Sequence, residues 1–213
     1  MTDSAPLRDD LLQAMADEGC PVCTVIRAAA HRRIESQFHE LVNDGDFRAR
    51  LRRSGGLCPE HCEDYIRLGD PLGLSIIAKD LLESEARQLG RGQRKPRRCP
   101  ACADMEDHAK RTCADMARLL ARPDWQERYS ASSGLCMLHV AGLLRFCDAP
   151  TAVWVCSIEI SKMDALAEAL DLVIRHHDYR FQSEPWGDEV GSWKQALRKL
   201  CGQPRTIADE ERR

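Results

Sequence analysis

The feature that most constrains this chain is a duplicated set of cysteine and histidine motifs. A CPVC motif at 20–23 recurs 79 residues later as CPAC at 99–102, and GLCPEH at 56–61 recurs 78 residues later as GLCMLH at 134–139. Aligned over 46–61 and 124–139, the two segments share seven of sixteen residues, where unrelated segments of average composition would share about one. A nearly constant offset indicates two copies of one folded unit rather than scattered cysteines.

The spacing of these motifs is typical of metal binding. Two ligands separated by two residues can approach one ion from a single turn, and zinc takes four thiolate or imidazole ligands in a tetrahedron. We therefore predict two zinc ions, each bound within one copy by three cysteines and one histidine. The predicted ligands are Cys20, Cys23, Cys58 and His61 in the first copy, and Cys99, Cys102, Cys136 and His139 in the second. A helix out and a segment back are expected to span the 34 and 33 residues between the paired motifs.

The motifs are also expected to open helices. Cys20 and Cys58 are each followed by a proline, which is favoured at the first position of a helix. A thiolate at such a position lies against free backbone N–H groups and the positive end of the helix dipole. Gly56 and Gly134, which precede the second motif in each copy, are expected to allow a positive φ or a close backbone approach.

Two other chemistries remain open for the same residues. Three cysteines and a histidine can hold an iron-sulphur cluster instead of zinc. A Cys-Pro-x-Cys pair at a helix start could also act as a thiol-redox pair. The redox alternative leaves the paired Cys-x-x-His motifs without a role, and neither CPxC motif follows a strand, as a thioredoxin-like site would.

Apolar periodicity predicts an all-α fold. Residues recur at helical spacing over 7–15, 23–42, 71–90 and a long tract after Pro150, and a short terminal helix is expected over 193–200. No segment alternates with the period of a strand. We expect two pseudo-repeated helical units, each stapled by a Cys3His site, plus a short C-terminal helix.

The expected domain organisation follows the repeat. A segment at 90–98 with two glycines, a proline and five basic residues has the composition of a linker. The boundaries expected from this are 1–95 for the N-terminal helix and first unit, 96–180 for the second unit, and 181–213 for the C-terminal helix and tail.

Composition narrows the function classes. A net charge of −3 in 213 residues provides no overall basic field for nucleic acid. The basic segment at 90–98 could contact phosphates, and nucleic-acid binding stays a second alternative, but aromatic residues for base stacking are missing around it. The N-terminus is polar and acidic, no apolar run is long enough to span a membrane, and eleven cysteines suit metal or catalysis in a reducing compartment. We therefore expect a cytoplasmic protein with no membrane partner.

The remaining cysteines lack a counterpart in the other copy, and most are expected to be buried core thiols. These are Cys62, Cys113, Cys147, Cys156 and Cys201. Cys62 adjoins His61 and could also be an auxiliary ligand or an oxidation-sensitive neighbour. No phosphate-binding loop, Ser-His-Asp set or carboxylate pair stands out, so the chain is interpreted as an interaction or regulatory module with an unknown protein partner, and not as an enzyme.

At its CPxC and GLCxxH motifs the chain resembles a bacterial family known only as a domain of unknown function. The segments HDYRF at 177–181, EPWGDE at 184–189 and SW at 192–193 resemble its C-terminal signature. The resemblance spans about residues 19–202. It implies a small soluble bacterial protein and supports the ligand residues, but it implies no activity.

Overall fold

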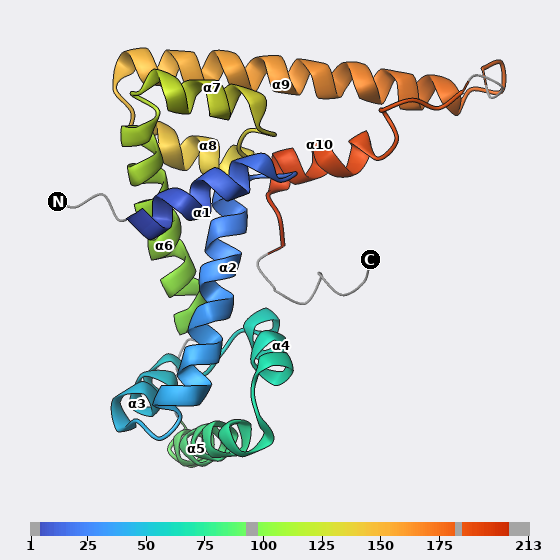
Figure 1. Ribbon diagram of the computed structural model, residues 1–213. Helices are drawn as coiled ribbons and strands as arrows, with labels where there is room; N and C mark the ends of the chain where they lie inside the picture. The colour runs from blue at the N-terminus through green and yellow to red at the C-terminus, as the bar shows by residue number, and fades with distance from the viewer. Residues whose placement is uncertain (1–4, 93–97, 182–184, 205–213) are drawn as a thin grey trace. The chain divides into compact units, whose positions relative to one another are not determined.

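The computed structural model describes residues 5–92, 98–181 and 185–204, and within them every regular element is a helix. The prediction of an all-α fold is thus confirmed, and each of the five helical stretches expected from periodicity is found (Figure 1). The order along the chain is α1 (Ala5–Ala16), α2 (Pro21–Ser36), a π-helical turn η1 (Gln37–Leu41), α3 (Gly45–Ser54), α4 (Pro59–Leu68), α5 (Pro71–Gly90), α6 (Pro100–Leu119), α7 (Pro123–Ala131), α8 (Met137–Leu144), α9 (Ala149–His176) and α10 (Ser192–Cys201).

The duplication is visible in the helix order. Copy 1 contributes α2 to α5 and copy 2 contributes α6 to α9. Equivalent helices begin alike: Asp70 caps α5 by accepting the Gly73 N–H at 2.9 Å, and Asp148 caps α9 by accepting the Thr151 N–H at 2.9 Å. Side-chain caps of this kind satisfy backbone donors that have no partner within the helix. The two copies therefore share local structure as well as sequence.

The chain forms two compact units, and these do not coincide with the two copies. Unit 1 contains residues 5–25 together with Ala109–Gln203, whereas unit 2 contains Ile26–His108. Helix α2 begins in unit 1 and continues into unit 2, and α6 begins in unit 2 and continues into unit 1. The units are interleaved along the sequence, which differs from the consecutive boundaries expected at residues 95 and 180.

Unit 2 is organised around an apolar core from five helical segments. Ile34 on α2, Phe38 on η1 and Leu51 on α3 are buried, and Tyr65 on α4 meets the Phe38 ring edge-on with centroids 5.4 Å apart. Ile77 on α5 completes the set of buried residues. An edge-to-face aromatic pair adds about 0.5–1.5 kcal/mol to what burial alone contributes. This core positions the start of α4, where the second motif of copy 1 lies.

Unit 1 has a larger core in which a charged residue is buried. Trp125 and Tyr129 on α7 are almost fully buried, and the Tyr129 ring lies 5.8 Å from the Trp154 ring of α9. Glu159 on α9 is buried at 2% exposure beside them. Its partners come from α7, from the chain before α8 and from α10, and they bear directly on the candidate site described below.

The residues shortly before α10 are held to the end of α9. The His176 ring at the end of α9 stacks on Trp186 with centroids 4.4 Å apart, and His176 Nε2 lies 3.1 Å from Glu189 Oε1. The chain then enters α10, which has no equivalent among the described residues of copy 1. Among the described residues, no helix combines the length and the apolar character needed to cross a membrane.

Candidate metal centres

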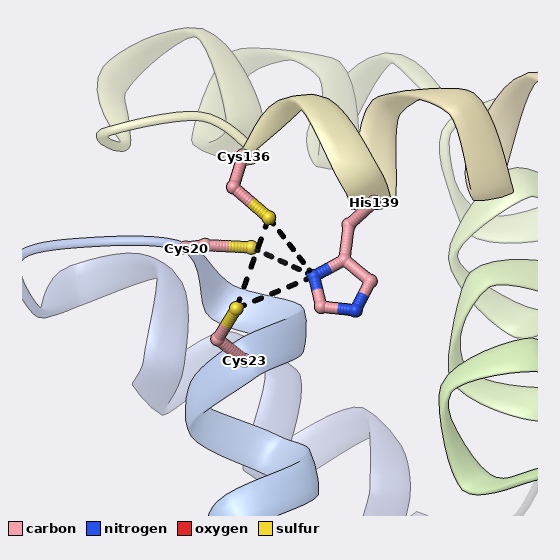
Figure 2. A group of neighbouring side chains, drawn as sticks. All are labelled: Cys20, Cys23, Cys136 and His139. Atoms are coloured by element: carbon pink, nitrogen blue, oxygen red, sulfur yellow. Dashed lines mark hydrogen bonds between the residues drawn. The ribbon is translucent and has the colours of Figure 1, made fainter. Parts of the chain in front are cut away.

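Unit 1 brings two cysteines from the start of α2 to the start of α8 (Figure 2). His139 Nδ1 lies 3.4 Å from the sulphur of Cys20, 3.3 Å from that of Cys23 and 3.2 Å from that of Cys136. The sulphurs of Cys23 and Cys136 are 3.8 Å apart. All four donor atoms lie within 4.8 Å of one another.

Unit 2 contains the equivalent quartet, built from the starts of α4 and α6. His61 Nδ1 lies 3.1 Å from the sulphur of Cys58, 3.7 Å from that of Cys99 and 3.4 Å from that of Cys102. The sulphurs of Cys58 and Cys102 are 3.7 Å apart. These four donor atoms also lie within 4.8 Å of one another.

The separations are close to the edges of a zinc coordination tetrahedron, although most of those to the imidazole nitrogen are shorter. With Zn–S near 2.3 Å and Zn–N near 2.0–2.1 Å, a tetrahedron has S–S edges of about 3.8 Å and S–N edges of about 3.6 Å. The S–S separations of 3.7 and 3.8 Å are far longer than a disulfide, whose bond is about 2.05 Å. Each quartet therefore has the donor types and spacing to hold one metal ion.

The pairing of motifs within each copy, as expected from the sequence, is wrong. The CPxC motif of copy 1 meets the Cys-x-x-His motif of copy 2, and the CPxC motif of copy 2 meets the Cys-x-x-His motif of copy 1. The eight expected residues are the ones that cluster, but each quartet is shared between copies.

Helix lengths explain the exchange. The 16 residues of α2 and five of η1 carry the chain about 30 Å at about 1.5 Å per residue. The 10 residues of α3 span only about 15 Å. A return along α3 is too short to cancel the length of α2 and η1, and Cys58 joins a quartet other than that of Cys20. In copy 2, α6 has 20 residues and α7 nine, so the same imbalance applies.

Four helix N-termini surround the two quartets, two at each. Cys58 and Cys136 are the N-caps of α4 and α8. Cys20 and Cys99 precede Pro21 and Pro100, and their carbonyls accept N–H groups four residues on, at 3.1 and 3.2 Å. Three thiolates, one neutral imidazole and Zn²⁺ sum to one negative charge, which the positive helix ends would offset.

The same surroundings favour charge separation within a quartet before a metal binds. Burial opposes protonation of His61, but hydrogen bonds with the thiols of Cys99 and Cys58 raise its pKa to about 9. Burial also opposes ionisation of Cys99, yet hydrogen bonds from His61 and from the backbone of Cys58 and Cys102 lower its pKa to about 6. In unit 1, burial likewise opposes protonation of His139, and the thiols of Cys136 and Cys23 raise its pKa to about 9.

A buried polar network supports the second motif of copy 2. Glu159 Oε1 accepts the Leu135 N–H at 2.9 Å, and the carboxylate is also bonded to the Tyr129 hydroxyl and to the ammonium of Lys199 from α10. Gly134 has φ +73°, and a Cβ there would lie 2.6 Å from Glu159 Oε1. The network thus fixes the backbone one residue before Cys136, where the sequence had pointed only to the glycine.

The aligned position in copy 1 holds an apolar residue. Gly56 has φ +92°, and a Cβ there would have Leu81 as its nearest neighbour from elsewhere in the fold, at 3.7 Å. Leu81 aligns with Glu159 at the 78-residue offset of the second motif. The positive φ expected at both glycines is confirmed, but the support beneath each turn is chemically different.

Sequence reasoning also missed the neighbour of the unit 2 imidazole. His61 Nε2 lies 3.0 Å from the Met105 thioether sulphur, three residues after Cys102 on α6. A histidine that binds metal through one ring nitrogen usually has a polar partner at the other. The spacing of Met105 after the CPxC motif is the signal that could have drawn attention to it.

The cysteines outside the quartets are mostly not core residues. Only Cys113 among the five is buried, Cys147 and Cys156 are half-buried, and Cys62 and Cys201 are exposed. Burial raises the pKa of Cys113 to about 12. Most of the basic segment that carried the nucleic-acid alternative, residues 93–97, lies outside the described residues.

The fold and the two quartets define a duplicated all-α protein with two candidate Cys3His metal centres. The chain belongs to the family of unknown function DUF6062, whose profile matches residues 4–97 and 90–206. A relative described as an uncharacterized 23.9 kDa protein in the xynA 3′ region of Caldicellulosiruptor sp. (strain Rt8B.4) is 24% identical over 204 residues, which cover 90% of this chain and 99% of the relative. No solved structure matches the chain.

Proposed function

We propose that the protein binds two zinc ions, one in each quartet, and acts as a metal-stapled interaction or regulatory module. The observation that carries this proposal is the agreement of the donor separations with tetrahedral edges in both quartets. The same geometry recurs at equivalent positions of the repeat, which supports a selected property rather than chance clustering.

The compactness of each quartet favours a single ion over an iron-sulphur cluster. Ligands of a multi-iron cluster bind different iron atoms and so stand further apart than ligands of one ion. Here every donor atom lies within 4.8 Å of the other three. Zinc is the metal that proteins most often hold with such a tetrahedral thiolate and imidazole set.

A structural role for the metal follows from the number of donors. A catalytic zinc keeps one position open for water or substrate, whereas a structural zinc has four protein ligands. Each quartet supplies four donors. Bound zinc would tie the start of α2 to the start of α8, and the start of α4 to the start of α6, which links helices that are distant in sequence.

The interaction role is supported by the orientation of α10. Its charged Lys199 is turned inward to Glu159, while Trp193, Leu197 and Leu200 are 50%, 57% and 57% exposed. These three apolar residues recur at spacing i, i+4 and i+7, which places them on one face of the helix. An exposed apolar face of this kind suits contact with an apolar groove or helix of a protein partner.

Elemental analysis of the purified protein, with a visible spectrum, tests the metal proposal. We expect two zinc ions per chain and no visible absorption band. The Cys62→Ser and Cys201→Ser variants change exposed thiols outside the quartets and should keep both ions. Iron with sulphide absorbance, or protein purified without a tightly bound metal that also fails to take up zinc, would reject the proposal.

The interaction role needs a separate experiment. Leu197→Lys places a charge on the exposed face of α10, and Leu172→Lys does the same on α9, where Leu172 is 48% exposed. Each variant is expressed in cells and crosslinked to the proteins it contacts. A specific partner should be crosslinked to Leu172→Lys and not to Leu197→Lys. Equal recovery of every crosslinked protein by both variants would count against α10.

A further inference from the structure

The two quartets contain one pair of equivalent sulphurs that differ mainly in exposure. In unit 1 the pair is Cys23 and Cys136, 3.8 Å apart and both buried. In unit 2 the aligned pair is Cys102 and Cys58, 3.7 Å apart and both half-buried. The two sulphur pairs can therefore be compared within one protein. They have the same residue types and nearly the same separation, but they differ in solvent exposure.

Unit 1 has a cover over its sulphurs that belongs to α10 and the residues after it. A Cβ on Gly202, at the end of α10, would lie 3.5 Å from the Cys136 sulphur and 3.5 Å from Leu138. Lys199 of the same helix holds Glu159, which in turn accepts the N–H of Leu135 next to Cys136. Because the described part of copy 1 has no helix equivalent to α10 after α5, this type of cover is specific to unit 1.

Unit 2 has further sulphur close to its half-buried pair. Cys62 lies one turn after Cys58 on α4, where its N–H bonds to the Cys58 carbonyl at 2.9 Å, and its side chain is exposed. Cys58 and Cys102 lie on α4 and α6, so a bond between them would join two helices. Their sulphurs need to approach by less than 2 Å to reach disulfide distance, which is about 2.05 Å.

We propose that the unit 2 quartet is an oxidation site at which a peroxide joins Cys58 and Cys102 in a disulfide and releases the bound metal ion, while the unit 1 quartet stays loaded. This inference rests on the proposed function, because it requires that both quartets hold a metal. It adds a modification site, a class of reactant and a difference between the two centres.

The chemistry balances without a further reactant. One of the two thiolates attacks a peroxide oxygen, the O–O bond breaks, and a sulfenic acid forms as hydroxide leaves. The second thiolate attacks the sulfenic sulphur, the S–S bond forms, and a second hydroxide leaves. Two electrons pass from the two sulphurs to hydrogen peroxide, two protons from solvent convert both hydroxides to water, and Zn²⁺ loses two of its four ligands. Cys99 and His61 alone hold the ion too weakly to retain it.

The test uses the full-length, metal-loaded protein. Metal content is measured first, since protein that carries no metal would contradict the proposed function itself. Hydrogen peroxide is then added in the presence of a colorimetric zinc chelator, and the disulfides are identified by peptide mapping without reductant. We expect one equivalent of zinc per chain in a fast phase, together with a Cys58–Cys102 disulfide, and retention of the other equivalent.

The control variant is Cys62→Ser, which removes the exposed neighbouring thiol and keeps all eight quartet residues. It should release the same single equivalent and form the same disulfide. The inference would be overturned if both ions left at one rate, if unit 1 lost its ion first, or if Cys62 replaced Cys58 or Cys102 in the disulfide. In each of these results, a metal content of two ions per chain before peroxide is added would still support the proposed function.

Discussion

The sulphurs of Cys23 and Cys136 lie 3.8 Å apart although 113 residues separate them in the chain. This contact distinguishes the observed pairing of motifs from the pairing that the shorter intervening segments would suggest. It also means that a substitution in copy 2 should affect a motif in copy 1.

Cys136→Ser tests the pairing directly. With its metal ligand lost, the unit 1 quartet should release one of the two ions, and Cys20 and Cys23 should become reactive toward an alkylating reagent. Cys99 and Cys102 should stay protected, because they share a quartet with Cys58 and His61. Mass spectrometry of the alkylated peptides gives the readout. Protection of Cys20 and Cys23 with exposure of Cys99 and Cys102 would instead support pairing within each copy.

The buried pair of Glu159 and Lys199 should be important to the stability of unit 1. Lys199→Met leaves the carboxylate buried without its cation, and removal of one partner from such a pair costs about 3–5 kcal/mol. Adding Glu159→Gln removes the unpaired charge but keeps an oxygen to accept the Leu135 N–H. Urea unfolding should therefore show the double variant to be more stable than Lys199→Met alone. If the second substitution lowered stability further, the charge would not be the source of the loss.

The two motif glycines form a matched pair for a steric test. Gly56→Ala should cost about 1–2 kcal/mol, which is the penalty for a left-handed conformation, because its Cβ meets only Leu81 at ordinary contact distance. Gly134→Ala has the same conformational cost and also brings its Cβ to 2.6 Å from Glu159 Oε1. Overpacking adds about 1–3 kcal/mol. The urea midpoint should thus fall further for Gly134→Ala than for Gly56→Ala. Equal midpoints would show that the Glu159 side chain moves away from the new Cβ at no cost in stability.

Unit 2 of the metal-free protein should be less stable below pH 6 than above it, because the loss of the His61 contribution at alkaline pH is offset by the gain of the Cys99 contribution. The folded-state pKa of His61 is raised to about 9, so its contribution to the free energy of unfolding is lost as pH rises through 9. The folded-state pKa of Cys99 is lowered to about 6, so its contribution to the free energy of unfolding is lost as pH falls through 6. Between these limits the folded pair is imidazolium and thiolate, and its net charge equals that of the neutral unfolded pair, so this contribution is flat.

Urea unfolding of chelator-treated protein at pH 5, 7.5 and 10 provides the measurement. His61→Gln removes the imidazolium and serves as the control. The difference in stability between wild type and this variant should be smaller at pH 5 than at pH 7.5 and should change little from pH 7.5 to pH 10. A difference that grows steadily toward pH 5 or pH 10 would contradict the assigned directions.

Much of this fold could be predicted because its signals are local. The spacing of apolar residues sets each long helix, Asp70 and Asp148 mark two starts, and the glycine before each second motif marks a turn. The eight quartet residues could also be recognised, because their motifs are short and duplicated. These features depend on a few neighbouring residues, so one sequence is enough to reveal them.

The partners of the motifs could not be predicted, because they depend on how far each helix carries the chain. The expectation that a segment back could cancel the length of α2 overlooked the shortness of α3. The role of Glu159 was missed for a related reason: its partner Lys199 is 40 residues away on α10. A signal did exist in the sequence. Glu159 lies on the same helix face as Thr151 and Val155, which are uncharged and buried, so a charged residue at this position indicates a buried partner.

The reciprocal exchange of motifs has a consequence for how such a chain could arise. A polypeptide with only one copy would carry two half-sites that its own helices hold apart. Two identical polypeptides of that kind, related by a two-fold axis, would complete both sites by donating to each other, as isologous dimers do. Duplication within one gene keeps that mutual donation inside a single molecule. In the present chain the two sites differ: α10 and a buried ion pair support the unit 1 quartet, whereas the unit 2 quartet has two half-buried sulphurs and an exposed neighbouring thiol.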